Sequence, residues 1–324
     1  MSLATTYLGL QLPHPLVVGS SHLTDDLGIV RELEDAGAAA LVLRPLYEEE
    51  IVAEQMAAFF SDSHDDSFSE ASSHAPEPDA AVGPDEYLDH LRRVKAAVNV
   101  PVVAALNGAT LRGWTSFARL LEQAGADGLQ LELYHAASDP TMSAAEVERG
   151  MVEVVSEVKR SLRIPVAVKL SPLFTAFGHF ARQIDVAGAD GLTLFTRFHR
   201  ADIDVVELEV VRTFPVSSFV DLSLRLRGVA ALAGRVKASL AVAGGVHTAL
   251  DVVKATMTGA HAVHIVSALV RYGPGHLNAL RRDLDAWLAE HEWDSLEQMR
   301  GNMGFDRIPD PALYERTNFR TMVQ

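Results

Sequence analysis

The 324-residue chain contains no cysteine. This excludes disulfide bonds within the chain, zinc or iron–sulfur sites with cysteine ligands, and any thiol nucleophile or thiol base. Basic residues are also scarce, because 28 Lys and Arg stand against 43 Asp and Glu, for a formal net charge of −15. No dense run of Lys and Arg offsets this charge, so we expect no nucleic-acid partner.

Long apolar runs are missing as well. No segment approaches the roughly 20 apolar residues that a membrane-spanning helix needs. Residues 1–9 also lack the basic start and apolar core of a secretory signal. We therefore expect a cytoplasmic protein with no membrane partner. The 48% hydrophobic and 22% charged residues are typical of a folded globular chain.

Repeated helix ends are the most regular feature of the sequence. Gly-Ala pairs at residues 37–38, 125–126, 188–189 and 259–260 each precede a short apolar run, and glycine is typical of a helix C-cap. Further apolar runs begin near Pro15, Pro101 and Pro165, where proline can start a strand without losing a ladder donor. Together these signals predict eight strands, at residues 16–20, 40–44, 102–107, 128–133, 166–170, 191–195, 240–243 and 262–266. Apolar spacings of three and four predict helices at residues 27–33, 85–98, 114–123, 144–162, 177–185, 248–257 and 274–291.

Eight near-continuous apolar strands separated by helices predict an α/β chain, a single (β/α)8 TIM barrel over residues 1–324. Two insertions interrupt this alternation of strands and helices. Residues 61–84, after the second strand, are rich in Ser, Asp, His and Pro, which predicts a lid-like loop. Residues 197–233 follow the sixth strand, and their segment 204–211 favours an extra strand pair. We expect the tail, residues 293–324, to wrap the barrel or a neighbouring subunit.

The chemistry of such a barrel lies at the carboxyl ends of its strands and in the loops that follow them. Glycines after the seventh strand and a short polar turn after the eighth predict a phosphate site, because backbone N–H groups can approach an anion closely there. The alternative is a glycine pair in a turn without a ligand. The residues that this rule selects include Gly19, Ser20, Arg44, Asn107, Glu132, Tyr134, His135, Lys169, Thr196, Gly244, Gly245 and Ser267, with Ser21, Ser171 and Arg197 beside them.

Lys169 ends the fifth strand among core residues, where an unpaired ammonium would be costly. Three interpretations remain open at this point. Lys169 could form a Schiff base, as in an aldolase, or lie as a cation beside an electron-rich cofactor ring. It could also simply pair with Glu132 on the neighbouring strand.

His261 and His264 form the one pair with metal-like spacing, but strand alternation sends them to opposite faces. No other cluster of His, Asp and Glu has ligand spacing, so we expect no metal. A Gly-x-Gly-x-x-Gly motif after a strand is absent too, which disfavours a dinucleotide-binding fold.

The order of several motifs along the chain resembles the dihydroorotate dehydrogenase family, FMN-dependent (β/α)8 barrels of pyrimidine biosynthesis, and especially its soluble branch. The resemblance extends from residues 5–10 to residues 314–316. The motifs that carry it are Thr5-Thr6-Tyr7-Leu8-Gly9-Leu10, Gly19-Ser20, Gly83-Pro84-Asp85-Glu86-Tyr87-Leu88, Leu106-Asn107-Gly108, Val168-Lys169-Leu170-Ser171-Pro172, Gly244-Gly245-Val246-His247-Thr248, Ser267-Ala268-Leu269, Glu297-Gln298-Met299-Arg300-Gly301 and Tyr314-Glu315-Arg316.

The resemblance implies FMN as the cofactor, a small-molecule substrate and a homodimer. It implies that Lys169 lies near the N1–O2 edge of the flavin and favours its reduced, anionic form. In such enzymes a base removes a proton from one carbon while a hydride passes from its neighbour to flavin N5. The cofactor-binding residues that it implies are Gly19, Ser20, Arg44, Asn107, Glu132, Lys169, Thr196, Gly244, Gly245, Ser267 and Ala268.

The chain departs from the family pattern at the base. Family members carry cysteine or serine in the loop after the fourth strand, where this chain has Tyr134 and His135. We predict His135, with Tyr134 as second choice, as the acid/base, because the histidine pKa is close to neutral. A solvated loop histidine is the alternative.

The family's expected polar groups also differ at three strand ends. Glu132 and Thr196 replace expected asparagines, and Arg44 replaces an expected lysine. Amide side chains suit the donor and acceptor edges of orotate, so their loss predicts a substrate other than dihydroorotate. The alternatives to a flavin oxidoreductase are a catalytically idle barrel that acts as a structural or binding subunit, and a lyase that uses Lys169.

Overall fold

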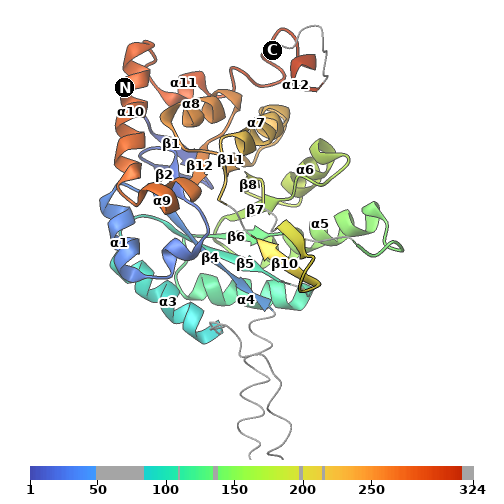
Figure 1. The fold of residues 1–324 in the computed structure, drawn as a ribbon. Coiled ribbons are helices and arrows are strands. Elements are labelled where there is room, and N and C mark those ends of the chain that lie inside the picture. The colour runs from blue at the N-terminus through green and yellow to red at the C-terminus, as the bar shows by residue number, and fades with distance from the viewer. Residues whose placement is uncertain (49–83, 109, 134–137, 197–199, 214–215, 316–324) are drawn as a thin grey trace, which may run out of the picture.

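The computed structural model describes residues 1–48, 84–108, 110–133, 138–196, 200–213 and 216–315. Eight parallel strands close into a barrel in the order β11-β12-β3-β4-β5-β6-β7-β8, and helices surround it (Figure 1). The predicted (β/α)8 barrel is therefore confirmed. Its strands are β3 (Leu16–Val18), β4 (Ala40–Tyr47), β5 (Val102–Asn107), β6 (Gly128–Glu132), β7 (Val166–Leu170), β8 (Gly191–Leu194), β11 (Ser239–Ala243) and β12 (Ala262–Ile265).

The helices that cover the barrel begin at side-chain caps in several places. Thr248 and Ser143 form capping boxes with Asp251 and Glu146, and these satisfy N–H groups that the first helical turn leaves unpaired. The longer helices are α1 (Leu27–Asp35), α3 (Pro84–Ala97), α4 (Leu111–Gln123), α5 (Ala144–Ser161), α6 (Phe177–Val186), α7 (Val220–Leu232), α8 (Ala249–Thr258) and α10 (His276–Glu290). The shorter ones are η1 (His22–Thr24), α9 (Ser267–Tyr272), α11 (Leu296–Met299) and α12 (Ala312–Glu315).

The helix predictions missed α7 and α9. Helix α7 lies inside residues 197–233, where no helix was predicted, and it connects the sixth barrel strand to the seventh. The helix predicted over residues 274–291 is confirmed as α10. The short α9 precedes it and was not predicted; Gly273 ends α9 with a φ of +79°, and Pro274 follows.

An N-terminal hairpin of β1 (Thr5–Tyr7) and β2 (Leu10–Leu12) contributes to the barrel interior. Tyr7, only 2% exposed, packs with small strand residues such as Ala105, Ala167 and Ala241. Burial raises the pKa of Tyr7 to about 12. The small alanines leave room for the phenol, so the hairpin fills volume that the strands do not.

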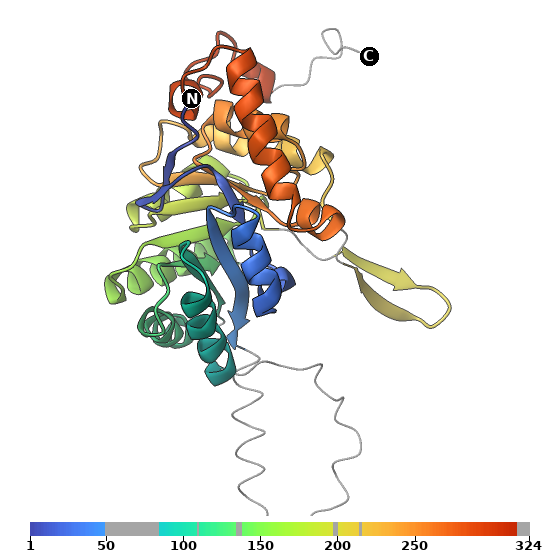
Figure 2. The same ribbon diagram turned by 90° about the vertical axis from the view of Figure 1, so that its left-hand side faces the viewer.

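The segment after the sixth barrel strand carries the predicted extra strand pair. Strands β9 (Arg200–Asp204) and β10 (Glu209–Thr213) are antiparallel and project away from the barrel (Figure 2). Residues 205–208 form the turn between them, so the pair is longer than the predicted segment 204–211.

The chain beyond residue 293 packs on the barrel's own helices as far as the described residues go. The Met303 N–H donates to the Met257 carbonyl on α8 at 2.8 Å, and the Phe305 N–H donates to the Ala230 carbonyl on α7 at 3.1 Å. Among the described helices, none is long and apolar enough to cross a membrane. Of the predicted lid, residues 61–84, residues 61–83 lie outside the described residues, and Pro84 is not in a loop but begins α3.

Candidate active site

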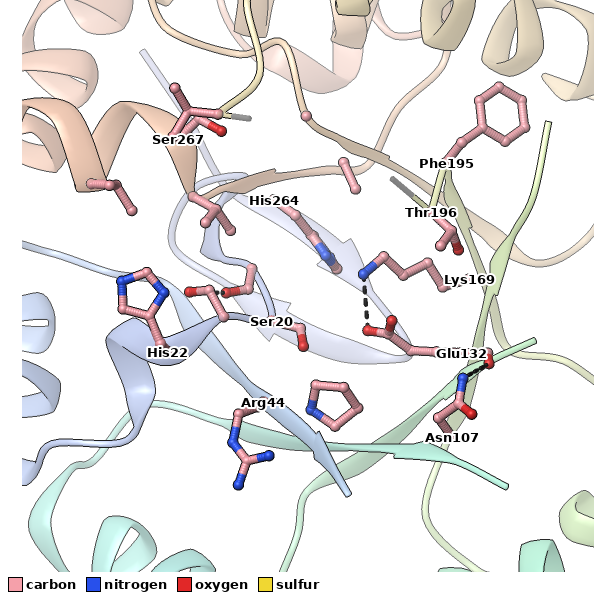
Figure 3. Close-up of a pocket in the computed structure, with 18 of the residues that line it drawn as sticks. Ser20, His22, Arg44, Asn107, Glu132, Lys169, Phe195, Thr196, His264 and Ser267 are labelled. Atoms are coloured by element: carbon pink, nitrogen blue, oxygen red, sulfur yellow. Dashed lines mark hydrogen bonds and ion pairs between the residues drawn. The ribbon is translucent and has the colours of Figure 1, made fainter. Parts of the chain in front are cut away.

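A cavity of about 610 Å³ opens at the carboxyl ends of the barrel strands. Figure 3 shows side chains from different strands converging on it. The barrel thus brings residues that are distant in sequence to one cavity. The residues singled out from the sequence that line it are Gly19, Ser20, Arg44, Asn107, Glu132, Lys169, Thr196, Gly244 and Ser267.

Four of the singled-out residues are placed differently. Gly245 and Ala268 follow the lining residues Gly244 and Ser267 in the sequence but do not line the cavity themselves. Tyr134 and His135 lie outside the described residues, so their role as acid/base stays a prediction.

Lys169 and Glu132 are register neighbours on β7 and β6. Lys169 Nζ donates to Glu132 Oε1 at 2.9 Å, and the two side chains are 14% and 10% exposed. Of the three interpretations of Lys169, the structure therefore shows the pairing with Glu132. Both charged groups still line the cavity and can act on a ligand there (Figure 3).

A chain of hydrogen bonds connects this ion pair to the barrel interior. Thr193 Oγ1 donates to Gln130 Oε1 at 3.3 Å, and Gln130 Nε2 donates to Glu132 Oε1 at 3.1 Å. The Thr193 hydroxyl has one proton and gives it to Gln130, so the Tyr7 hydroxyl, 3.1 Å away, must donate to Thr193. Every donor in the chain therefore points toward the Glu132 carboxylate.

Three buried polar atoms in the cavity wall have no hydrogen-bond partner among the described residues. They are Ser20 Oγ, Thr196 Oγ1 and His264 Nε2. Buried polar groups are almost always hydrogen-bonded in folded proteins, because desolvating them alone is costly. Their convergence on one cavity indicates a ligand with several hydrogen-bonding groups.

His264 is a site residue that sequence reasoning missed. Burial, and then the nearby charge of Lys169, lower its pKa to about 3, so the imidazole is neutral at pH 7. Strand alternation correctly separates His264 from His261: His261 Nδ1 accepts from the Leu240 N–H outside the cavity wall. Alternation alone does not say which of the two histidines faces the ligand. Within the described ranges, no group of three or more His, Asp or Glu could hold a metal ion.

Comparison with known proteins identifies the family. The family model of dihydroorotate dehydrogenase matches residues 80–288. The chain belongs to the dihydroorotate dehydrogenase family. It is accordingly an oxidoreductase of that type, in a family that is flavin-dependent in general.

Curated relatives match part of the chain or nearly the whole of it. A putative dihydroorotate dehydrogenase A (fumarate) of Aeropyrum pernix is 30% identical over 217 residues, 63% of this chain and 67% of its own. The catalytic subunit of dihydroorotate dehydrogenase B (NAD(+)) of Thermoplasma volcanium is 23% identical over 314 residues, 92% of this chain and 97% of its own. The same subunit of Geobacillus sp. WCH70 is 30% identical over 182 residues, 53% of this chain and 57% of its own.

The turn after β11 requires glycine at both Gly244 and Gly245, for its backbone conformation and for its packing. Gly244 and Gly245 have φ of +91° and +85°, in the left-handed region that favours glycine. A Cβ on Gly245 would lie 2.5 Å from the Leu222 backbone nitrogen, and one on Gly244 would lie 3.2 Å from Arg225 Nη2. Both glycines thus allow the turn to pack tightly against α7.

A serine from the segment before α7 ties the two strand-end turns together. The Ser217 N–H and hydroxyl donate to Ser267 Oγ at 2.7 and 2.9 Å, and the Gly245 N–H donates to Ser217 Oγ at 3.1 Å. Ser217 is 2% exposed. It ties the turn after the seventh barrel strand to the first residue of α9 after the eighth strand, and the sequence offers no motif that identifies it.

The opposite wall is held by a second set of contacts. Arg44 pairs with Asp25, with Nε 3.4 Å from Oδ1, and its carbonyl accepts from the Tyr87 hydroxyl at 2.6 Å. Asn107 Nδ2 donates to the Glu132 carbonyl at 2.9 Å. These contacts tie β4 to Asp25 and α3, and the end of β5 to the end of β6.

Proposed function

We propose that this chain binds FMN in the 610 Å³ cavity and oxidises or reduces a C–C bond of a small molecule. The observation that carries the proposal is the convergence of three buried polar atoms, without hydrogen-bond partners among the described residues, on a cavity at the carboxyl ends of a (β/α)8 barrel in a chain of this family. FMN, when bound, supplies a hydride acceptor or donor at its N5 atom.

The residues present fit such a group. Ser20, Thr196 and His264 offer hydroxyl and imidazole atoms that need hydrogen-bond partners, and an isoalloxazine ring carries carbonyl and imide groups that can supply them. Lys169 adds a cation to the same wall. The remaining ring and wall contacts in the proposal come from Gly19, Arg44, Asn107 and Glu132.

The phosphate end of FMN suits the two strand-end turns. Gly244 and Ser267 line the cavity, with Gly245 and Ala268 next to them, and glycine turns leave room for an anion close to the backbone. Ser217 does not line the cavity. It holds Gly245 and Ser267 in place through its hydrogen bonds to both residues.

The proton transfer is assigned to the loop that follows β6. In the proposal His135, or Tyr134, takes or gives the proton at the substrate carbon, in the place where family members use cysteine or serine. The chain has no cysteine to serve as this base.

The active form in this proposal is a homodimer, as the resemblance to the family implies.

The substrate in this proposal is not dihydroorotate. Glu132 and Thr196 replace two amide side chains that would match the edges of orotate, and Glu132 adds a negative charge that opposes the orotate carboxylate.

A lysine-dependent lyase is the weaker alternative. Lys169 Nζ donates to the Glu132 carboxylate at 2.9 Å, and attack of this nitrogen on a carbonyl would break the buried ion pair. Trapping with borohydride in the presence of small aldehydes and ketones tests this alternative, and we expect no adduct on Lys169.

The absorbance spectrum of the purified protein tests the flavin proposal. We expect flavin absorption bands, either as purified or after incubation with FMN, and one equivalent of FMN released on denaturation. A colourless protein that takes up no FMN would overturn the proposal and favour the idle barrel. Anaerobic addition of dihydroorotate should leave the flavin oxidised; bleaching within turnover times would contradict the substrate assignment alone.

A further inference from the structure

Glu132 receives two hydrogen bonds on one oxygen. Lys169 Nζ at 2.9 Å and Gln130 Nε2 at 3.1 Å both donate to Oε1. No partner of Oε2 is found among the described residues, and the carboxylate lines the cavity with Lys169 (Figure 3). A ligand that contacts Lys169 therefore meets a carboxylate at the same place.

Buried residues of the barrel interior hold the Glu132 carboxylate in place through hydrogen bonds. Gln130 and Thr193 are fully buried, and Tyr7 is 2% exposed. Their hydrogen bonds all donate toward Glu132, and such a chain of donors stabilises a negative charge at its end. Because Gln130 donates directly to Oε1, we expect the carboxylate to stay beside Lys169 when the charge of a ligand changes.

The charge of a flavin changes when it is reduced. Two electrons and one proton convert the oxidised ring to a reduced ring with one negative charge, and a second proton would neutralise it. An ammonium group in contact with the ring favours the anion, whereas a carboxylate at the same distance opposes it. Both groups are at most 14% exposed, so water screens their effects weakly.

We propose that Glu132 lowers the reduction potential of the bound flavin by offsetting the positive charge of Lys169, with Gln130 as the positioning residue that holds the carboxylate. This inference rests on the proposed function, because it needs FMN in the cavity. It goes beyond that function in assigning the pair a joint role: together the two groups present almost no net charge to the ring, where Lys169 alone would present a full positive charge.

The test is an anaerobic redox titration of the FMN-loaded protein with dithionite as reductant, compared between wild type and Glu132→Gln. The substitution keeps the shape of the side chain and removes its charge while Lys169 remains. We expect the affinity for reduced relative to oxidised FMN to rise at least tenfold, a shift of the two-electron potential of about +30 mV. The double variant Glu132→Gln with Lys169→Met should return toward the wild-type potential, because both charges are then absent.

Two further variants complete the experiment. Glu153→Gln removes the same charge at an exposed position of α5 and should leave the potential unchanged. Gln130→Met removes the donor that holds Glu132 and should shift the potential in the same direction as Glu132→Gln, but by less; it also serves if Glu132→Gln does not fold.

The outcomes separate the two proposals. A wild-type protein that binds no FMN overturns the proposed function and this inference with it. A wild-type protein that binds FMN, with a potential that neither Glu132→Gln nor Gln130→Met raises, overturns the assignment of Glu132 alone.

Discussion

Gly245 lies against Leu222 so closely that a Cβ on Gly245 would be 2.5 Å from the Leu222 backbone nitrogen. This contact packs the turn after β11 onto the first turn of α7. The same turn places Gly244 in the cavity wall. Packing between a loop and a helix thus shapes the end of the cavity at which we propose that phosphate binds.

Gly245→Ala is therefore expected to destabilise the protein and weaken FMN binding. The new Cβ adds a clash with the α7 backbone to the cost of a φ of +85°, together about 2–4 kcal/mol of the free energy of unfolding. Urea denaturation measures the loss. Gly125→Ala is the matched control: its φ is +100° but nothing lies within 4 Å, so only about 1–2 kcal/mol should be lost and FMN binding retained. Equal losses in the two variants would contradict the role of the contact.

Ser267→Ala should cost about 1–3 kcal/mol of unfolding free energy, because it leaves the buried Ser217 N–H without an acceptor. We also expect weaker FMN binding, since Ser217 no longer connects the two turns. Urea denaturation and fluorescence titration with FMN measure the two effects. Ser223→Ala removes an exposed serine hydroxyl on α7 and should change neither; an unchanged FMN affinity in Ser267→Ala would argue against a phosphate site at these turns.

The sequence was enough to predict the barrel because its strands are buried on both faces and read as short apolar runs. It placed the end of the second barrel strand at Arg44, whereas β4 continues to Tyr47 after a register shift between Val42 and Pro45. A charged residue followed by proline is typical of a strand end, and the irregularity that lets the strand continue depends on pairing with β5.

Helix α7 escaped prediction because its apolar residues do not gather on one face. Val220 and Leu224 are 65% and 46% exposed, while the charged side chain of Arg225 is buried. Arg225 is accommodated by donating to the carbonyls of Ala243 and Asp221. Such a partner is a tertiary contact, and no periodicity in the sequence reveals it.

At the site, the rule that strand ends carry the chemistry selected most of the described cavity wall in advance. It did not select His264, because the predicted strand extends to residue 266 and places the histidine at its middle, whereas β12 ends at Ile265. Its relevance comes from an imidazole that faces the cavity with Nε2 unpartnered among the described residues. The Lys169–Glu132 pair was one of three open interpretations, and only the observed distance of 2.9 Å distinguishes it.

Tyr7→Phe should lower the free energy of unfolding by about 1 kcal/mol, because the Tyr7 hydroxyl donates to Thr193 inside the barrel. The ring volume is retained, so the packing with the alanines of the interior should not change. Denaturant unfolding measures the loss, and Tyr272→Phe, at a tyrosine that is 57% exposed, serves as control. If the two variants unfold alike, the interior hydrogen bond contributes nothing to stability.

His264 gives the apoprotein a pH-dependent stability. Its pKa is about 3 in the folded chain, against 6.5 for an unperturbed histidine, so between these values the unfolded chain binds a proton that the folded chain does not. Stability is complete above pH 6.5 and falls as the pH falls toward 3, by at most about 1.4 kcal/mol per pH unit for this residue. His264→Gln should flatten the slope between about pH 7.5 and 5 in urea unfolding of the FMN-free protein. An unaltered slope would show that His264 is protonated in the folded chain.

A crystal structure of the protein with FMN shows whether the cavity at the carboxyl ends of the barrel strands holds the cofactor. We expect the isoalloxazine ring against Lys169, Ser20, Thr196 and His264, with the phosphate between the turn that contains Gly244 and the start of α9 at Ser267. Electron density for FMN elsewhere, or a cavity that stays free of FMN at saturating concentration, would show that the cavity is not the flavin site.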